Sequence, residues 1–107
     1  MNNKLKPIHP GEILREELLI PLNISPNELA RDIKVPKQLI EWICEERVDI
    51  TLDIAVRLSI YFNSTSDFWM NMQKSYENKL FDIKEKELRK FIVPYEKIQV
   101  ERSRIII

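Results

Sequence analysis

Only a few side chains in this 107-residue chain have the types that catalysis or metal binding requires. His9 is the only histidine and Cys44 the only cysteine, and neither has partners at metal-ligand or nucleophile–base spacing. The adjacent carboxylates Glu16 and Glu17 would point apart on a helix, so they form no acid–base pair. We therefore expect no enzymatic activity, cofactor or metal, with His9 at a helix entry and Cys44 in the core.

Aromatic and basic side chains that suit nucleic acids are present, but their pattern is mostly structural. Phe68 and Trp69 recur with later apolar residues at three- and four-residue steps, which is typical of the inner face of a helix. The cations of residues 84–90 are interleaved with acids, which favours a solvated helix face over a nucleic-acid stripe. Trp42 has three interpretations: it contacts DNA, it contacts a second copy or a partner protein, or it packs in the core.

Composition and length fit one compact domain with an appendage. Apolar residues make up 44% of the chain and charged residues 32%, which supports a core and excludes wholesale disorder. A lone cysteine indicates a reducing compartment. No apolar run approaches the ~20 residues of a membrane span, and no signal peptide precedes Lys4 and Lys6. We expect a cytoplasmic protein with no membrane partner.

The net charge of zero is unevenly distributed. Residues 25–50 hold four lysines and arginines against six acids, a net charge of −2, whereas residues 80–107 hold seven against five, a net charge of +2. Non-specific DNA affinity comes mostly from cations that release counterions. This balance therefore argues against strong, unassisted nucleic-acid binding.

Start and stop signals predict three short helices in the first half of the chain. The first starts near Pro10 and ends at Pro21. The second is capped by Ser25 and stops before Pro36, and the third follows over about residues 36–45. The short link between the second and third helices is typical of a helix-turn-helix.

The second half predicts three more helices and a tail. Thr51 caps the fourth helix, Ser66 or Thr65 caps the fifth, and residues 80–93 form an amphipathic sixth helix that Pro94 ends.

The tail at residues 95–107 carries brief apolar alternation at Ile98 and Val100, which predicts a strand. The chain finishes in three isoleucines at 105–107. Because an exposed triple isoleucine is unusual, we expect the domain, a second copy or a partner to cover it.

Four segments carry a specific resemblance in one uninterrupted register over about residues 8–78. They read Ile8-His-Pro-Gly-Glu-Ile-Leu-Arg-Glu-Glu17, Ser25-Pro-Asn-Glu-Leu-Ala30, Ile50-Thr-Leu-Asp-Ile-Ala-Val-Arg-Leu-Ser-Ile-Tyr-Phe62 and Ser66-Asp-Phe-Trp-Met-Asn-Met-Gln73. This pattern resembles the HigA-type antitoxins of bacterial toxin–antitoxin systems. The resemblance implies an all-α, lambda-repressor-like five-helix domain at residues 1–78. Residues 79–107 carry no such resemblance and form a C-terminal extension, for which the residue pattern predicts an extra helix and a short β tail.

The resemblance also implies a function. Such antitoxins are homodimers that silence a HigB-like, mRNA-cleaving toxin and repress their own operon. The third helix would enter the major groove of operator DNA, with two such helices ~34 Å apart in the dimer. Carried over by position, the base-reading residues are Lys37, Gln38, Glu41 and Trp42. The phosphate-contacting residues are Ser25, Asn27, Lys34, Arg47 and Thr51.

The DNA-reading segment departs from the family pattern. Pro26 stands where a glutamine usually contacts phosphate, and Glu45 and Glu46 stand where an Asn-Gly turn is usual. These acids would face DNA phosphates and repel them. Two alternatives follow: a stand-alone helix-turn-helix transcriptional regulator, or a protein-binding module that has lost DNA recognition. A further hypothesis is that the toxin or the basic tail supplies the missing positive charge.

Overall fold

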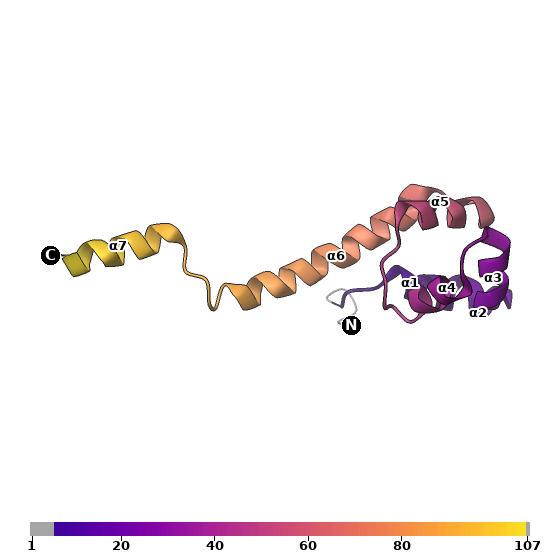
Figure 1. The fold of residues 1–107 in the computed structure, drawn as a ribbon, viewed down its shortest axis with the longest axis horizontal. Helices are drawn as coiled ribbons and strands as arrows, with labels where there is room; N and C mark the ends of the chain where they lie inside the picture. The colour runs from indigo at the N-terminus through magenta and orange to yellow at the C-terminus, as the bar shows by residue number, and fades with distance from the viewer. Residues whose placement is uncertain (1–5, 107) are drawn as a thin grey trace.

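The computed structural model describes residues 6–106, which form helices and no strand (Figure 1). The predicted all-α, helix-turn-helix fold is confirmed. In chain order the elements are α1 (Pro10–Ile13), η2 (Leu14–Leu19, a π-helix), α2 (Ile20–Leu22), α3 (Pro26–Ile33), α4 (Lys37–Cys44), α5 (Leu52–Tyr61), α6 (Ser66–Leu88) and α7 (Tyr95–Ile106). In the part of the chain that the structure describes, no helix is long and apolar enough to cross a bilayer.

The first helix begins at a histidine cap. His9 is buried, and its Nδ1 accepts a hydrogen bond from the backbone N–H of Gly11 at 2.8 Å. The His9 ring also packs edge-on against Tyr76 of α6, with the ring centroids 4.9 Å apart. The predicted helix-entry role of His9 is therefore confirmed.

The prediction that Pro21 ends this helix is wrong. The helix continues to Leu22 and ends at Asn23, which has a φ of 56°. The preceding π-turn explains the continuation: the backbone N–H of Ile20 bonds to the carbonyl of Arg15, five residues back. In a regular α-helix the ring of Pro21 would clash with the carbonyl four residues earlier. The wider π-turn moves that carbonyl away.

Three predicted N-caps are confirmed by hydrogen bonds. Ser25 Oγ accepts from the N–H of Glu28 at 3.0 Å, and Thr65 Oγ1 accepts from the N–H of Phe68 at 3.1 Å. Thr51 Oγ1 makes the same bond at the start of α5, at 3.3 Å. Each hydroxyl satisfies one backbone donor that the first turn of a helix leaves free.

The core lies between η2, α3, α4, α5 and the first half of α6. Its fully buried side chains include Leu14, Leu29, Ile40, Leu58 and Trp69. Cys44 is buried as predicted. The prediction that Phe68 joins this core is wrong, because it is 46% exposed. Consecutive residues of a helix point in different directions, so Trp69 points into the core and Phe68 points away from it.

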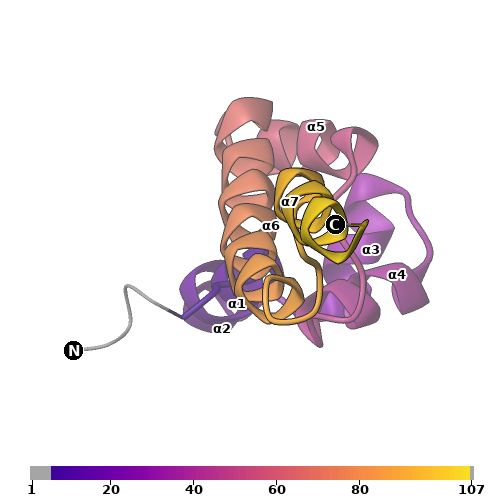
Figure 2. The ribbon, with the colours of Figure 1, turned by 90° about the vertical axis from the view of Figure 1, so that its left-hand side faces the viewer.

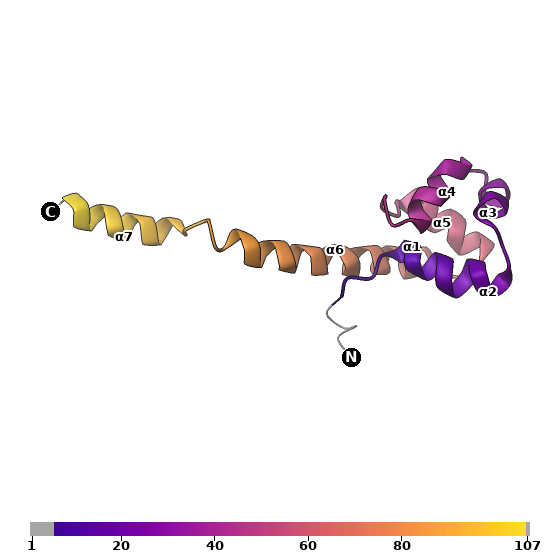
Figure 3. The same cartoon turned by 90° about the horizontal axis from the view of Figure 1, so that it is seen from below.

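The structure has one helix where the sequence predicts a fifth and a sixth. α6 is unbroken because no proline or glycine lies between Ser66 and Leu88. Its first half packs against α1 and α5, and the rest extends away from the domain (Figures 1 and 3). Every residue from 80 to 97 is exposed, and the division of the chain between residues 78 and 79 stays a prediction.

The predicted tail strand is wrong, because residues 95–106 form α7. The carbonyl of Pro94 accepts from the N–H groups of Lys97 and Ile98, which starts a helix there. α6 also ends at Leu88, earlier than predicted, and the N–H groups of Phe91 and Ile92 both bond to the carbonyl of Leu88. The expected covering of the isoleucines at 105–107 lies outside what the structure describes.

The two distal helices make the molecule long. Its principal extents are 71 × 32 × 23 Å and its radius of gyration is 20.5 Å, against about 13 Å for a compact chain of this size. Figure 2 looks along this axis and shows α7 in front of the domain. We call residues 80–102 the arm.

Candidate nucleic-acid interface

The helix-turn-helix consists of α3, a three-residue turn and α4. Lys34 begins the turn with a φ of 64°, a left-handed conformation that glycine adopts most easily. The N–H groups of Lys34 and Val35 both bond to the carbonyl of Ala30, which closes the last turn of α3. Pro36 then turns the chain into α4 without needing a backbone donor.

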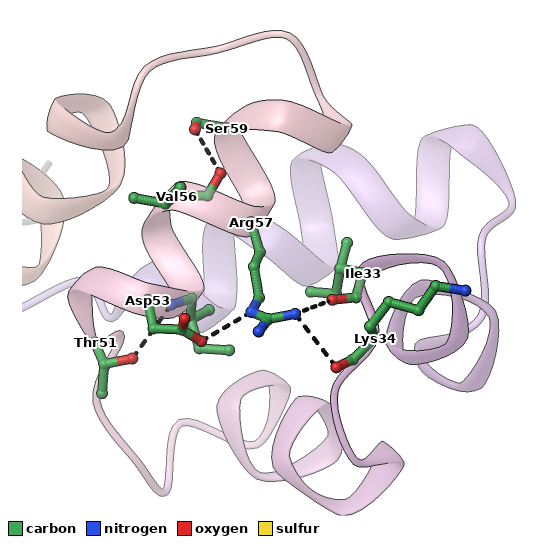
Figure 4. A network of polar contacts seen from close by, with 8 residues as sticks. Ile33, Lys34, Thr51, Asp53, Val56, Arg57 and Ser59 are labelled. Carbon is green, nitrogen blue, oxygen red and sulfur yellow. Dashed lines mark hydrogen bonds and ion pairs between the residues drawn. The ribbon is translucent and has the colours of Figure 1, made fainter.

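Arg57 of α5 fixes this turn from outside (Figure 4). Its Nη1 donates to the carbonyl oxygens of Ile33 at 2.6 Å and Lys34 at 3.3 Å. Its Nε pairs with Asp53, one turn earlier on α5, at 2.9 Å. A cation on the last carbonyls of a helix is favourable, so Arg57 stabilises α3 and sets where α4 starts. Arg57 was not predicted as a site residue.

The other end of α4 is held by the first helix. Arg15 donates to the carbonyl of Cys44, the last residue of α4, and pairs with Glu46 at 3.4 Å. Gly11 lies so close that a Cβ on it would be 1.8 Å from the carbonyl oxygen of Ile43. This close approach explains the glycine in the His-Pro-Gly-Glu segment. Arg15 and Gly11 were also not predicted as site residues.

The predicted base-reading residues lie on one outer face of α4. Lys37, Gln38 and Trp42 are exposed and Glu41 is half-buried, while the opposite face carries buried core residues. Trp42 is 38% exposed, so its reading as a core residue is wrong. The guanidinium of Arg47 lies 5.9 Å from the centre of the Trp42 ring. The face therefore combines two hydrogen-bonding side chains with a flat aromatic platform.

The predicted phosphate-contacting residues lie at helix ends and in the loop after α4. Ser25 and Thr51 are the N-caps of α3 and α5, so each hydroxyl oxygen accepts a backbone bond and keeps its own hydrogen to donate. Helix N-termini attract anions such as phosphate. Asn27, Lys34 and Arg47 are exposed, and their roles remain predictions.

The acids of this region are less isolated than the sequence indicates. Glu45 pairs with Arg47 at 3.5 Å, and Glu46 pairs with Arg15 at 3.4 Å. Arg15 and Arg57 bring two further cations from outside residues 25–50, and each also pairs with an acid from outside that range, Glu16 at 3.8 Å and Asp53 at 2.9 Å.

Cys44 has no nucleophilic environment. Burial raises the pKa of its thiol to about 11, and the carboxylates of Glu45 and Glu41 add to the rise while Arg15 opposes it. In the part of the chain that the structure describes, no three His, Cys, Asp or Glu residues are grouped to hold a metal.

Known proteins resemble this chain over most of its length. No protein-family model matches it. Virulence-associated protein I of Dichelobacter nodosus is 40% identical over 92 residues, which cover 86% of this chain and 84% of that protein. Antitoxin HigA-1 of Vibrio cholerae is 29% identical over 85% of this chain and 86% of its own length.

Solved structures agree with these relatives. The Pseudomonas aeruginosa antitoxin HigA, solved with the higBA promoter, superposes with a TM-score of 0.74 at 41% identity, covering 84% of this chain and 99% of that one. Antitoxin GraA in complex with its operator gives a TM-score of 0.74 at 34% identity, covering 83% of this chain and 91% of that one. The fold, these identities and the coverage of both chains agree, and the chain belongs to the HigA family of helix-turn-helix antitoxins.

Proposed function

We propose that this chain is the DNA-binding antitoxin of a type II toxin–antitoxin pair, which represses its own operon as a homodimer and neutralises a HigB-like toxin without catalysis. The proposal rests on the outer face of α4, where Lys37, Gln38 and Trp42 are exposed. We call this surface the reading face. Relatives solved with promoter or operator DNA support the proposal.

The mechanism of repression follows from the way α4 is held. Arg57 fixes the turn before α4 and Arg15 fixes its last residue, so the reading face keeps one orientation before DNA arrives. A pre-ordered helix loses little freedom on binding. Gln38 is suited to an adenine edge and Lys37 to a guanine edge. The N-termini of α3 and α5 then meet phosphates on either side.

A fluorescence-anisotropy titration on the chain's own upstream duplex, repeated at several salt concentrations, tests this function. We expect specific binding with a negative salt slope. Lys37→Ala should weaken it by about tenfold to a hundredfold, as for a lost base contact. Lys90→Ala, an exposed cation on the arm, is the matched control and should leave affinity nearly unchanged.

Absence of binding at low salt would contradict repression by this protein alone. Because Glu45 and Glu46 are exposed beside the reading face, the second candidate is a protein-binding module without DNA recognition. That candidate predicts a tight complex with a protein encoded by the neighbouring gene and no operator affinity. Binding of both DNA and that protein supports the antitoxin, whereas DNA binding alone supports a stand-alone regulator.

A further inference from the structure

Trp42 is the exposed side chain of the reading face that the contacts of Lys37 and Gln38 leave without a role. Its ring is 38% exposed, and it stands one helical turn beyond Gln38 on the same side of α4. The neighbouring side chains of this face, Lys37, Gln38 and Glu41, are polar. Trp42 therefore presents an apolar surface among hydrogen-bonding groups.

The loop after α4 holds the Trp42 ring in place. Glu46 has a left-handed φ of 62°, and the backbone N–H of Arg47 bonds to the carbonyl of Trp42 at 2.8 Å, which turns the chain back at the end of the helix. The Arg47 guanidinium then lies 5.9 Å from the centre of the ring, within the range of a cation–π contact. Glu45 pairs with the same guanidinium at 3.5 Å. The ring is thus positioned before a ligand arrives, so that binding orders it little further.

These surroundings suit a groove of DNA better than a protein interface. The aromatic residues that dominate protein interfaces lie at the centre of a well-packed patch from which water is excluded. Trp42 is bordered along α4 by charged and amide side chains instead. The major groove has the same character, since every base pair presents hydrogen-bonding groups there and the C5-methyl of thymine is the apolar group between them.

The position of Trp42 along α4 limits which base it reaches. It follows Gln38 by four residues, which advance about 6 Å along a helix. Successive bases of one DNA strand are about 3.4 Å apart. When α4 lies along the groove with Gln38 at an adenine edge, the Trp42 ring is therefore about two base pairs further on.

We propose that Trp42 selects operator DNA by packing its ring against the C5-methyl group of a thymine, about two base pairs from the base that Gln38 contacts. This inference rests on the proposed function and deepens it, since it assigns the chemical group that Trp42 recognises. The contact is apolar, so it needs the ring and not the indole N–H.

Deoxyuridine in place of thymidine tests the proposal, because uracil lacks only the methyl group. The anisotropy titration is repeated on the upstream duplex with each thymine replaced in turn. With the wild-type protein, one replacement should weaken binding about fourfold, which is the effect of leaving one methyl group unburied. Replacement in both half-sites should weaken it about fifteenfold. Trp42→Ala should bind the thymine duplex more weakly and should not distinguish it from the deoxyuridine duplex.

Two further variants identify the contact. Gln38→Ala is the matched control, because it removes a side chain of the same face one turn away; it should bind more weakly and keep the full effect of deoxyuridine. Trp42→Phe keeps an aromatic ring without the indole N–H, and it should also keep the effect. Thermal melting followed by circular dichroism should show all three variants folded, since both positions are exposed.

Tryptophan fluorescence gives a second measurement. Trp69 is fully buried, so acrylamide should quench mainly Trp42 in the free protein. The thymine duplex should protect that fluorescence from acrylamide in the wild type. In Trp42→Phe, where Trp69 is the remaining tryptophan, the duplex should change the quenching little.

The outcomes separate this inference from the proposed function. A deoxyuridine effect of equal size in the wild type and Trp42→Ala overturns the inference, and so does the absence of an effect at every thymine of a duplex that the wild type binds. Loss of the effect in Trp42→Phe also overturns it, because the indole N–H would then make the contact. In each case the operator binding itself stands. A wild type that does not bind the thymine duplex overturns the proposed function and this inference with it.

Discussion

Replacing Gly11 with alanine tests the contact between α1 and the reading helix. The added Cβ would lie 1.8 Å from the carbonyl oxygen and 2.8 Å from the carbonyl carbon of Ile43. Both atoms belong to the backbone of α4, so no side-chain rotation relieves the overlap. The two helices must separate, and the separation also lengthens the hydrogen bond from Arg15 to the carbonyl of Cys44.

The magnitude is a balance of opposing effects. Alanine in a helix is normally more favourable than glycine by about 1 kcal/mol. Overpacking against an immovable neighbour costs about 1–3 kcal/mol or more, and weakening a hydrogen bond from a charged donor costs about 1.5–3 kcal/mol. The steric and polar losses exceed the helical gain, so the free energy of unfolding should fall by about 2–4 kcal/mol. In a domain of this size, Tm falls by roughly 10–25 °C.

Thermal and urea unfolding followed by circular dichroism measure this loss. Glu17→Ala is the matched control, because Glu17 is exposed on η2, which continues α1. It should change stability by less than about 0.5 kcal/mol. A Gly11→Ala protein as stable as the wild type would refute the reasoning, because it would mean that α1 and α4 do not approach so closely. Operator affinity should fall together with stability, since the same contact positions α4.

Three further substitutions test other contacts of the site. Arg57→Leu should lower the free energy of unfolding by about 2 kcal/mol and weaken operator binding, because the carbonyls of Ile33 and Lys34 lose a charged donor. Urea titration measures the loss of stability, and Asp53→Asn is the control that keeps both carbonyl bonds. Glu46→Gly should stabilise by about 0.5 kcal/mol, because relief of a φ of 62° outweighs an exposed ion pair, and should raise DNA affinity at low salt in the anisotropy assay. The raised pKa of Cys44 keeps its proton bound in the folded chain, so its contribution to stability is complete below pH 9 and is lost as pH rises towards 11. Urea midpoints of wild type and Cys44→Ala should converge over that range, and native Cys44 should resist alkylation at pH 8.

Local chemistry made most helix starts predictable from the sequence. Ser25, Thr51 and Thr65 each bond to a backbone N–H three residues later, so the cap and its partner fall in the same short window. The inner faces of α3 and α4 were predictable for the same reason, because helical spacing fixes which residues share a side.

The residues that position α4 were not predictable in this way. Arg57 acts on a carbonyl 24 positions away, and Arg15 acts on one 29 positions away. In the sequence Arg57 has the spacing of an ordinary surface ion pair with Asp53, and Arg15 is one charge among several. Counting charge over residues 25–50 therefore understated the cations near the reading face, since both arginines come from outside it.

The wrong prediction for the tail has its physical reason in the hydrogen bonds of the backbone. Apolar residues two positions apart, such as Ile98 and Val100, suit a strand only if a neighbouring strand supplies backbone partners. The described chain offers none, so residues 95–106 bond their backbone internally as a helix. Helix formation satisfies the backbone and leaves the apolar side chains of the arm uncovered.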